Sequence, residues 1–183
     1  MDIQIELTAI GGTDGLRVTP CAPQDPGAGQ IRVRHDGIGV NFIDIYQRTG
    51  LYRLPLPAVL GVEGAGVIEA VGAEVEGLRI GDRIVYAGLT GGYTATRLLP
   101  AWRAVPLPDA IGSDIAAASF LRGLTAHMLL TRTHAVGADS TILVHAAAGG
   151  LGATLTAWAK RRGATVIGTA GSPEKAQIAR AAG

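Results

Sequence analysis

The stretch from Val144 to Gly152, which reads Val-His-Ala-Ala-Ala-Gly-Gly-Leu-Gly, is where this sequence points most directly to chemistry. A β-branched run, residues 141–144, leads into it, and an amphipathic stretch, residues 153–162, follows it. This order predicts a strand, a tight turn and a helix whose first N–H groups face a pyrophosphate. The spacing A-x-x-G-x-x-G is a variant of the dinucleotide-binding fingerprint, with alanine in place of the first glycine. A plain strand–helix turn is the alternative, and the flanking residues favour a cofactor loop.

The end of the next predicted strand, residues 164–169, bears on the choice between NAD and NADP. NAD sites place Asp or Glu there, about 20 residues past the glycines, to bind the ribose 2′-hydroxyl. This chain has no carboxylate before Glu174, which lies in the first turn of a helix predicted over residues 172–182 and capped by Ser172. Lys175 follows and can meet a 2′-phosphate as a point charge. We therefore predict NADPH; the alternative for Lys175 is an ordinary solvated helix position.

Residues 1–105 read mostly as short strands. Alternating or β-branched runs bounded by Gly, Pro or Asp predict strands at 3–7, 30–34, 67–71 and 83–86. A short helix is predicted over 41–48, with Asn41 as its N-cap. Strands of this length and spacing favour a small or partly open β barrel.

The pattern changes to helices after residues 106–109. Ser113 is predicted to cap one helix, and a second is predicted to begin within residues 124–131. From residue 141 the order is strand, helix, strand, helix, which opens a doubly wound parallel sheet. The fold class is therefore α/β, a β domain followed by the first part of a Rossmann sheet. Two buried parallel strands alone are a poor fold, so we expect a fragment or the ordered part of a longer protein.

Composition narrows the classes of function. The net charge of +1, with basic residues spread along the chain, argues against binding to nucleic acid or to a membrane surface. Residues 140–159 carry no charge and are long enough to span a bilayer, but they include two adjacent glycines and begin as a strand. We therefore expect no transmembrane helix. The N-terminus lacks the basic and apolar regions of a signal peptide, so a cytoplasmic protein is expected.

The isolated cysteine and the histidines point to structural roles. Cys21 is the single cysteine, which excludes an internal disulfide, and it lies in a proline-flanked segment that reads as a turn. His145 ends a strand predicted to be buried and is expected to be a hydrogen-bonded core residue. His35, His127 and His134 lack the spacing of metal ligands and are expected to be structural or surface residues.

Five stretches together carry a family resemblance, in the family's order and at its spacings: residues 41–52, 61–67, 81–86, 116–126 and 145–152. They resemble the zinc-independent medium-chain dehydrogenase/reductases, specifically the NADPH:quinone oxidoreductases related to zeta-crystallin. The resemblance covers nearly the whole chain. It implies a GroES-like catalytic domain over residues 1–124 and a partial Rossmann NADP-binding domain over residues 125–183. It also implies a homodimer for the intact protein.

The same stretches indicate whether this chain has the ligands of a zinc site. Zinc-containing members of the superfamily carry a Cys ligand near residues 41–44 and a Gly-His-Glu motif; this chain has no cysteine there and reads Gly61-Val62-Glu63. Without a thiolate or an imidazole, a tetrahedral zinc site cannot form, so we expect no metal and a structural role for Glu63. Hydride transfer without a Lewis acid suits quinones or conjugated enones better than alcohols.

The resemblance also implies the residues of the site. Asn41, Tyr46 and Tyr52 match positions beside the nicotinamide, where they would orient the ring and hydrogen-bond the acceptor oxygen while water supplies protons. Core positions in the β domain are the alternative for either tyrosine. The implied cofactor contacts are Phe42, Ile43, Thr125, Met128, Gly149, Gly150, Leu151, Gly152, Gly171, Ser172 and Lys175.

Two rival functions stay open. An enoyl-thioester or enone reductase of the same superfamily would use the same fold and cofactor with a different acceptor. An inactive fragment acting only as a binding module is the non-enzymatic alternative, because further cofactor contacts of the family lie beyond these residues.

Overall fold

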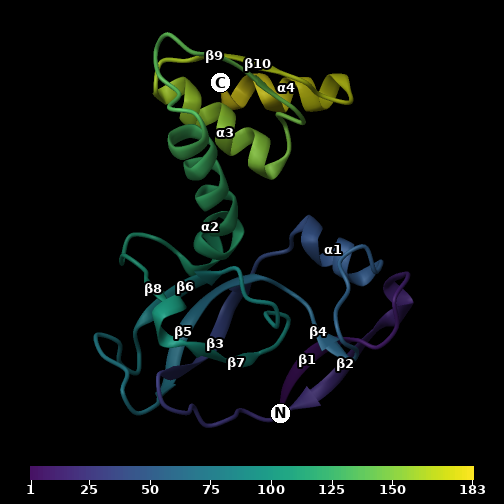
Figure 1. Ribbon diagram of the computed structural model, residues 1–183, viewed down its shortest axis with the longest axis vertical. Helices are drawn as coiled ribbons and strands as arrows, with labels where there is room; N and C mark the ends of the chain where they lie inside the picture. The colour runs from purple at the N-terminus through teal and green to yellow at the C-terminus, as the bar shows by residue number, and fades with distance from the viewer. The chain divides into compact units, whose positions relative to one another are not determined.

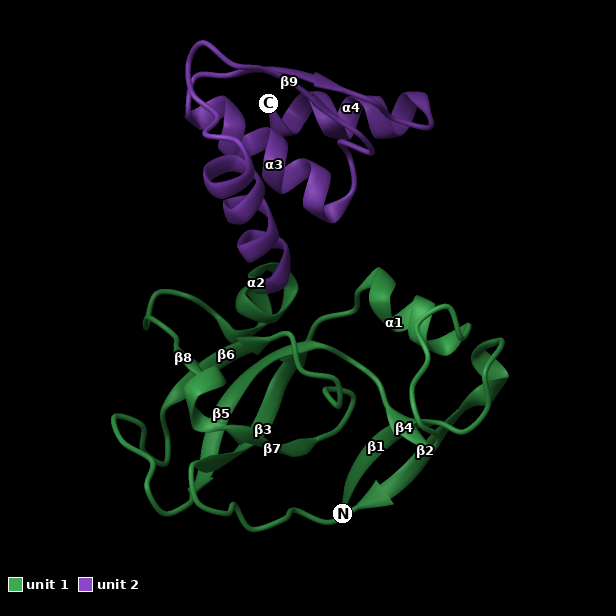
Figure 2. Ribbon diagram, in the orientation of Figure 1, with its two compact units in different colours: residues 1–120 green, residues 121–183 purple.

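The computed structural model describes residues 1–183, which divide into two compact units (Figures 1 and 2). The first unit is residues 1–120 and the second is residues 121–183. Each unit encloses its own cluster of buried apolar side chains. The units are therefore described one at a time.

The first unit consists mainly of antiparallel strands in two sheets, with orders β2-β1-β4 and β7-β3-β5-β6-β8. An isolated bridge between Gln4 and Thr94 links the two sheets. This arrangement agrees with the small, partly open β domain predicted from the strand spacing. The strands are β1 (Asp2–Leu7), β2 (Leu16–Cys21), β3 (Gln30–Ile38), β4 (Ala58–Val59), β5 (Glu63–Val71), β6 (Arg83–Ala87), β7 (Thr96–Pro100) and β8 (Val105–Pro106). Its helical segments are η1 (Thr13–Gly15), α1 (Phe42–Arg48) and η2 (Ala101–Arg103).

The core of this unit follows from the two-residue period of its strands. Ile31 and Val33 of β3 point to one face, where they meet Ile68 of β5 and Ile84 of β6 around the buried Tyr86. Full burial of each such side chain contributes roughly 1.5–3 kcal/mol. The alternating sequence therefore specifies both the strands and the face that they bury.

β3 and β5 approach each other closely at a bulge. Their register shifts between His35 and Gly37, next to the pairing of His35 with Gly66. A Cβ atom on Gly66 would lie 1.9 Å from the backbone oxygen of Arg34, so only glycine fits there. The sequence pattern placed a strand over residues 67–71 only; the observed β5 begins at Glu63, because two of the added positions are glycines that hide the alternation.

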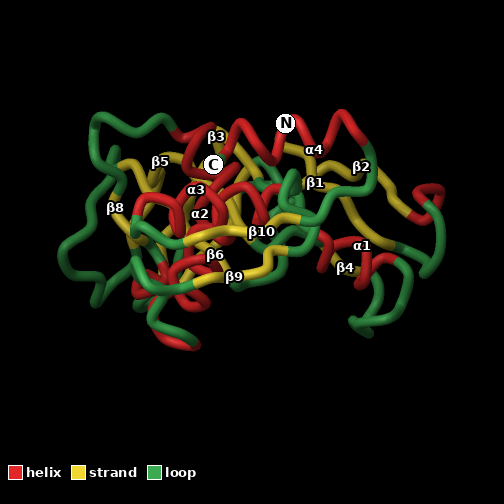
Figure 3. Tube along the Cα trace, turned by 90° about the horizontal axis from the view of Figure 1, so that it is seen from above, coloured by secondary structure: helices red, strands yellow, loops and turns green.

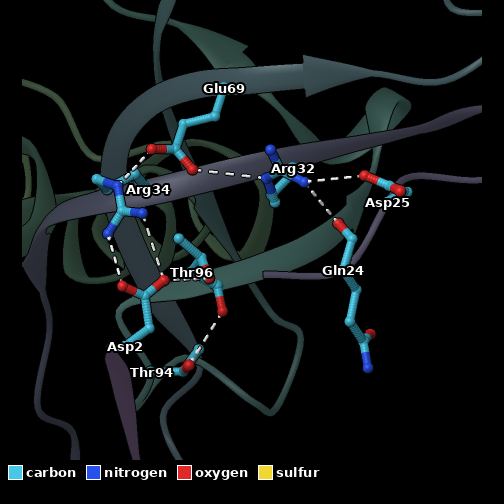
Figure 4. Close-up of polar contacts among 8 residues, drawn as sticks. All are labelled: Asp2, Gln24, Asp25, Arg32, Arg34, Glu69, Thr94 and Thr96. Atoms are coloured by element: carbon cyan, nitrogen blue, oxygen red, sulfur yellow. Dashed lines mark hydrogen bonds and ion pairs between the residues drawn. The ribbon is translucent and has the colours of Figure 1, made fainter. Parts of the chain in front are cut away.

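Charged residues on the outer positions of β3 form a ladder of ion pairs (Figure 4). Arg34 contacts Asp2 at the start of β1 and Glu69 on β5. Arg32 continues the ladder from Glu69 to Asp25, at 3.5 Å and 3.3 Å. The hydrogen bonds from Arg34 hold the pKa of the Asp2 carboxyl below its ordinary value. The ladder ties the N-terminal strand to the larger sheet.

A chain of hydrogen bonds crosses the core at His35. Its Nε2 lies 2.7 Å from the Tyr86 hydroxyl, and its Nδ1 lies 2.7 Å from the backbone oxygen of Thr94. Arg97 donates to the same Tyr86 oxygen at 3.3 Å. A neutral imidazole with its proton on Nδ1 satisfies every group, since Tyr86 then accepts from Arg97 and donates to His35. The structural role predicted for His35 agrees with this environment.

This histidine predicts a dependence of stability on pH. Burial lowers the pKa of His35 below its ordinary value of 6.5. Below pH 6.5 the unfolded chain therefore takes up a proton that the folded chain resists. The free energy of unfolding should fall as the pH drops from 6.5 toward the lowered pKa. Urea titrations at several pH values measure this slope. Replacing His35 by Gln should reduce it, whereas replacing the exposed His134 should not; equal slopes in both variants would contradict the assignment.

The second unit begins inside helix α2 (Ser113–His127) and packs helices against a small parallel sheet. Strands β9 (Thr141–Val144) and β10 (Thr165–Gly168) lie side by side (Figure 3), and their pairing is parallel. Ile142 and Val166 from these strands pack with Trp158 and Leu155 of α3. The other helical elements are the π-helical segment η3 (Met128–Thr133), α3 (Gly150–Arg161) and α4 (Pro173–Ala182). The predicted strand–helix–strand–helix order is confirmed.

Two helix predictions were wrong. The helices predicted from Ser113 and within residues 124–131 are one helix, α2, which continues into the π-helical segment. Gly123 lies inside α2 without ending it, because the residues on either side are strong helix formers. Ser113 is the first helical residue, and its hydroxyl donates to Asp36 at 2.9 Å instead of capping the helix.

Three environments also differ from expectation. Cys21 ends strand β2 instead of lying in a turn, with its Sγ 3.6 Å from the Thr94 hydroxyl. His145 is exposed, and its Nδ1 lies 3.3 Å from the Thr169 hydroxyl. The strands beside it are covered on one face only, since Leu143 is 57% and Ile167 54% exposed.

No helix of this structure has the length and apolar character needed to cross a membrane.

Candidate functional site

The turn between β9 and α3 has the geometry of a nucleotide-binding loop. β9 ends at Val144, and α3 begins at Gly150 with Gly149 as its N-cap. The Gly149 N–H donates to Ala146 O at 2.8 Å, which closes the turn, and Ala146 has a left-handed φ of 50°. Ala147 N donates to Thr169 O at 2.9 Å, which ties the loop to the end of β10. The chain therefore turns sharply and starts a helix just past the carboxyl end of the sheet.

The glycines of this loop leave a cradle that side chains would fill. A Cβ on Gly152 would lie 2.3 Å from Ala146 O and 2.8 Å from the Cα of Ala147, and one on Gly149 would lie 3.1 Å from the same oxygen. The first N–H groups of α3 have no partners within the helix, and its first turn has no acidic side chain. A pyrophosphate fits this cradle, because bare backbone and a helix N-terminus both favour an anion.

The segment after β10 holds the residues predicted to bind a 2′-phosphate. Ser172 caps α4, accepting from the Lys175 N–H at 3.3 Å, and Pro173 opens the helix. A hydrogen bond with the Ser172 hydroxyl lowers the pKa of Glu174 below its ordinary value. The Glu174 carboxylate therefore interacts with the capping residue at the start of α4. Gly171 has open space where a Cβ would be. The Lys175 side chain is exposed.

Helix α1 of the first unit is fixed at its start by two buried carboxylates. Asp44 accepts the Asn41 N–H and the Tyr93 hydroxyl, each at 2.8 Å. Burial, with the hydrogen bond to Asp44, raises the pKa of Tyr93. Glu63 is fully buried, and its Oε1 accepts from the Asn41 carboxamide at 2.8 Å. The Asn41 side chain therefore has a fixed orientation. A residue that positions a ligand needs such a fixed orientation.

The two predicted tyrosines form an exposed aromatic patch on α1 and the following loop. The rings of Tyr46 and Tyr52 meet edge to face with centroids 5.5 Å apart, and Phe42 lies 6.2 Å from Tyr46. The Tyr52 N–H donates to Tyr46 O at 3.0 Å, which holds the pair together. Tyr46 is 37% and Tyr52 52% exposed, so the core alternative is wrong for both. Flat, exposed rings can stack on a planar ligand.

The predicted site residues fall into two sets. Asn41, Phe42, Ile43 and the two tyrosines lie in the first unit, while the glycine loop and the 2′-phosphate segment lie in the second. Two further cofactor candidates belong to the second unit: Thr125, whose hydroxyl donates to Leu121 O at 2.9 Å, and Met128, which is 50% exposed. The pairing of Asp44 with Tyr93 was not predicted. Its one sequence signal is an aspartate three residues after the N-cap.

Two hollows in the first unit hold no predicted catalytic residue. One, of about 420 Å³, is lined mainly by residues of β1 and β3, and the other, of about 520 Å³, includes Cys21 and Arg97. The linings of both lack Asn41, Tyr46 and Tyr52. No three His, Cys, Asp or Glu side chains gather as a metal-binding group.

Known proteins match this chain along its length. Residues 27–109 match the alcohol dehydrogenase GroES-like domain. A quinone oxidoreductase from Salmonella typhimurium is 49% identical over 185 residues, covering 100% of this chain and 57% of that protein. A 2-haloacrylate reductase from Burkholderia is 40% identical over 181 residues, covering 94% of this chain and 54% of that protein. The crystal structure of Escherichia coli quinone oxidoreductase complexed with NADPH has a TM-score of 0.96 at 45% identity, over 99% of this chain and 56% of that one.

The agreement with the Escherichia coli structure extends over both units. Over both units this chain is similar to quinone oxidoreductases, and its residues 27–109 match the alcohol dehydrogenase GroES-like domain. The predicted fold, a GroES-like β domain followed by the first part of a Rossmann sheet, is confirmed. The chain spans a little over half the length of the quinone oxidoreductases that it matches, 57% of the Salmonella protein. The exact domain bounds, 1–124 and 125–183, stay predictions.

Proposed function

We propose that the full-length protein is an NADPH-dependent quinone oxidoreductase that transfers a hydride to a quinone or a conjugated enone. The observation that carries the proposal is the glycine cradle at the start of α3, where a Cβ on Gly152 would strike Ala146 O at 2.3 Å. A loop that bare backbone lines so closely suits the pyrophosphate of a dinucleotide. The relative of Escherichia coli, 45% identical, is complexed with NADPH, which supports the same cofactor here.

Each set of residues has its own task in this proposal. Gly149, Gly150, Leu151 and Gly152 would hold the pyrophosphate, while Gly171, Ser172 and Lys175 would hold the 2′-phosphate. Thr125 and Met128 of the second unit and Phe42 and Ile43 of the first would border the rest of the cofactor. When bound, NADPH supplies a hydride from its nicotinamide C4.

The first unit would supply the groups that meet the acceptor. The Asn41 carboxamide, held by Glu63 at 2.8 Å, and the hydroxyls of Tyr46 and Tyr52 would orient the ring and hydrogen-bond the acceptor oxygen. The exposed rings of the aromatic patch would stack on a planar quinone. The single proton that balances the hydride would come from water, giving a hydroquinone.

We also propose that the reaction needs no zinc. No cysteine or histidine stands at residues 41–44 or 61–63, so this part of the chain offers carboxylate and amide groups only. Such a donor set cannot build the N/S tetrahedral site of the zinc dehydrogenases. Quinones accept a hydride without a Lewis acid because the product is aromatic.

A cytoplasmic location and a homodimer of the intact protein stay predictions.

Asn41 gives the sharpest test of the site in the first unit. Replacing Asn41 by Ala should lower kcat for quinone reduction about tenfold or more, since the positioned carboxamide is lost. Stability should fall by about 1–3 kcal/mol, because buried Glu63 loses a donor. Tyr93→Phe is the matched control: it removes a donor to buried Asp44 and should cost similar stability while kcat stays near wild type. Equal kcat values in the two variants would contradict the role of Asn41.

A reductase of conjugated double bonds is the second candidate. The 2-haloacrylate reductase at 40% identity favours it, because that protein's substrate by name is an activated alkene. The two candidates share cofactor and fold and differ in the acceptor. Steady-state oxidation of NADPH by the full-length gene product, with a series of quinones and a series of enones, distinguishes them. The proposal expects turnover of at least one quinone; turnover of enones alone would favour the second candidate, and turnover of neither would refute both.

A further inference from the structure

An arginine from α2 lies against the first residue of α3. If Gly150 carried a Cβ, that atom would lie 2.7 Å from Cζ of Arg122 and 2.8 Å from its Nε and Nη1. The guanidinium therefore occupies the space that the missing side chain of Gly150 leaves. Both residues belong to the second unit, and Arg122 is partly buried.

This placement is electrostatically unfavourable without an anion. The N-terminus of a helix carries a partial positive charge, and cations are stabilised at the opposite end. The first turn of α3 has no acidic residue, and its own basic residues, Lys160 and Arg161, stand in its last turn. The ion pairs of this structure involve Arg32, Arg34 and Arg79, and Arg122 takes part in none of them.

We propose that Arg122 binds the pyrophosphate of the dinucleotide, opposite the N–H groups of the glycine loop. This inference rests on the proposed NADPH-binding function. A doubly charged pyrophosphate would neutralise the guanidinium and the helix terminus together, and a guanidinium can bind two phosphate oxygens at once. The absence of a side chain at Gly150 then has two uses: it admits the phosphate and leaves space for the arginine.

The second charged candidate, Lys175, lies beyond β10 and belongs to a different phosphate. Lys175 is in the first turn of α4, after the segment that replaces the NAD-type carboxylate. It would meet only the 2′-phosphate, which NADH lacks. Arg122 would meet a group that NADPH and NADH share. The two residues should therefore affect the two cofactors differently.

Binding of NADPH and of NADH to the full-length gene product, measured by isothermal titration calorimetry, tests this assignment. Arg122→Gln should raise the Kd for both cofactors by a similar factor, about tenfold to a hundredfold, as for loss of a charge-assisted hydrogen bond. Arg122→Lys should recover part of the loss, because it keeps the charge without the two-pronged geometry. The loss should shrink at high salt, since an ion pair is screened.

Arg161→Gln is the matched control, since it removes the same charge from the opposite end of α3. It should change the Kd less than twofold. The melting temperature of each variant without cofactor separates a structural effect: a structural role of Arg122 would lower it, whereas a binding role leaves it at or above the wild-type value. If wild-type protein binds NADPH and Arg122→Gln binds it equally well, the inference is wrong and the proposed function stands. If wild-type protein binds neither cofactor, the proposed function fails and this inference fails with it.

Discussion

Replacing Gly152 by Ala is expected to cost both stability and cofactor binding. The added Cβ would lie 2.3 Å from Ala146 O and 2.8 Å from the Cα of Ala147, both of which are backbone atoms. Because no flexible side chain can move aside, the loop itself must shift away from α3. Such overpacking costs about 1–3 kcal/mol, and the displaced loop should bind NADPH at least about tenfold more weakly. Urea unfolding and calorimetric titration of the full-length gene product measure the two effects.

Gly123→Ala is the control for this substitution. Gly123 also lies in a helix of the same unit, but nothing stands within 4 Å of its Cβ position. Alanine there should leave NADPH binding unchanged and stabilise the helix by up to about 1 kcal/mol. If Gly152→Ala behaved like Gly123→Ala in both measurements, the close cradle would have no role in cofactor binding.

Replacing Lys175 by Gln is expected to remove the preference for NADPH. The Kd for NADPH should rise about tenfold or more, and the Kd for NADH should change less than twofold, because only NADPH carries a 2′-phosphate. The measurement is a calorimetric titration of each variant with both cofactors. Lys160→Gln is the matched control, since Lys160 is the chain's other lysine and stands in the last turn of α3. If the wild-type protein binds NADPH and NADH equally, this role of Lys175 is wrong, and Lys175 is an ordinary solvated helix residue.

Much of this fold could be predicted from local pattern. The turn at residues 144–152 and the cap at Ser172 are specified within a few residues, so the β9–α3 turn and the start of α4 were predicted where they lie. The period of apolar residues similarly identified β1, β3 and β6. The interpretation of Gly123 as a break between two helices was wrong, because the helix formers on either side of it carry the helix through. The pattern suggested two helices across Gly123, whereas one continuous helix forms.

The site was predictable in its residue types and less so in its contacts. The asparagine at the start of α1 could be identified as a cap, but its bond to Glu63 joins positions 22 residues apart, which no spacing rule reveals. Arg122 lies 28 positions before Gly150 and gives no motif, so its place beside the glycine loop emerged only in three dimensions. His145 was expected to be buried because strands of a doubly wound sheet are covered on both faces, and here one face of β9 is open.

The central claim is that the glycine loop and the aromatic patch belong to an NADPH-dependent quinone reductase. The most direct measurement is the quinone-dependent oxidation of NADPH by the purified full-length gene product, followed at 1,4-benzoquinone saturation with and without a zinc chelator, and repeated with NADH. We expect stoichiometric formation of hydroquinone, a rate unaffected by the chelator, and a higher kcat/KM with NADPH than with NADH. No oxidation of NADPH above the uncatalysed rate, or a rate abolished by the chelator and restored by zinc, would contradict it.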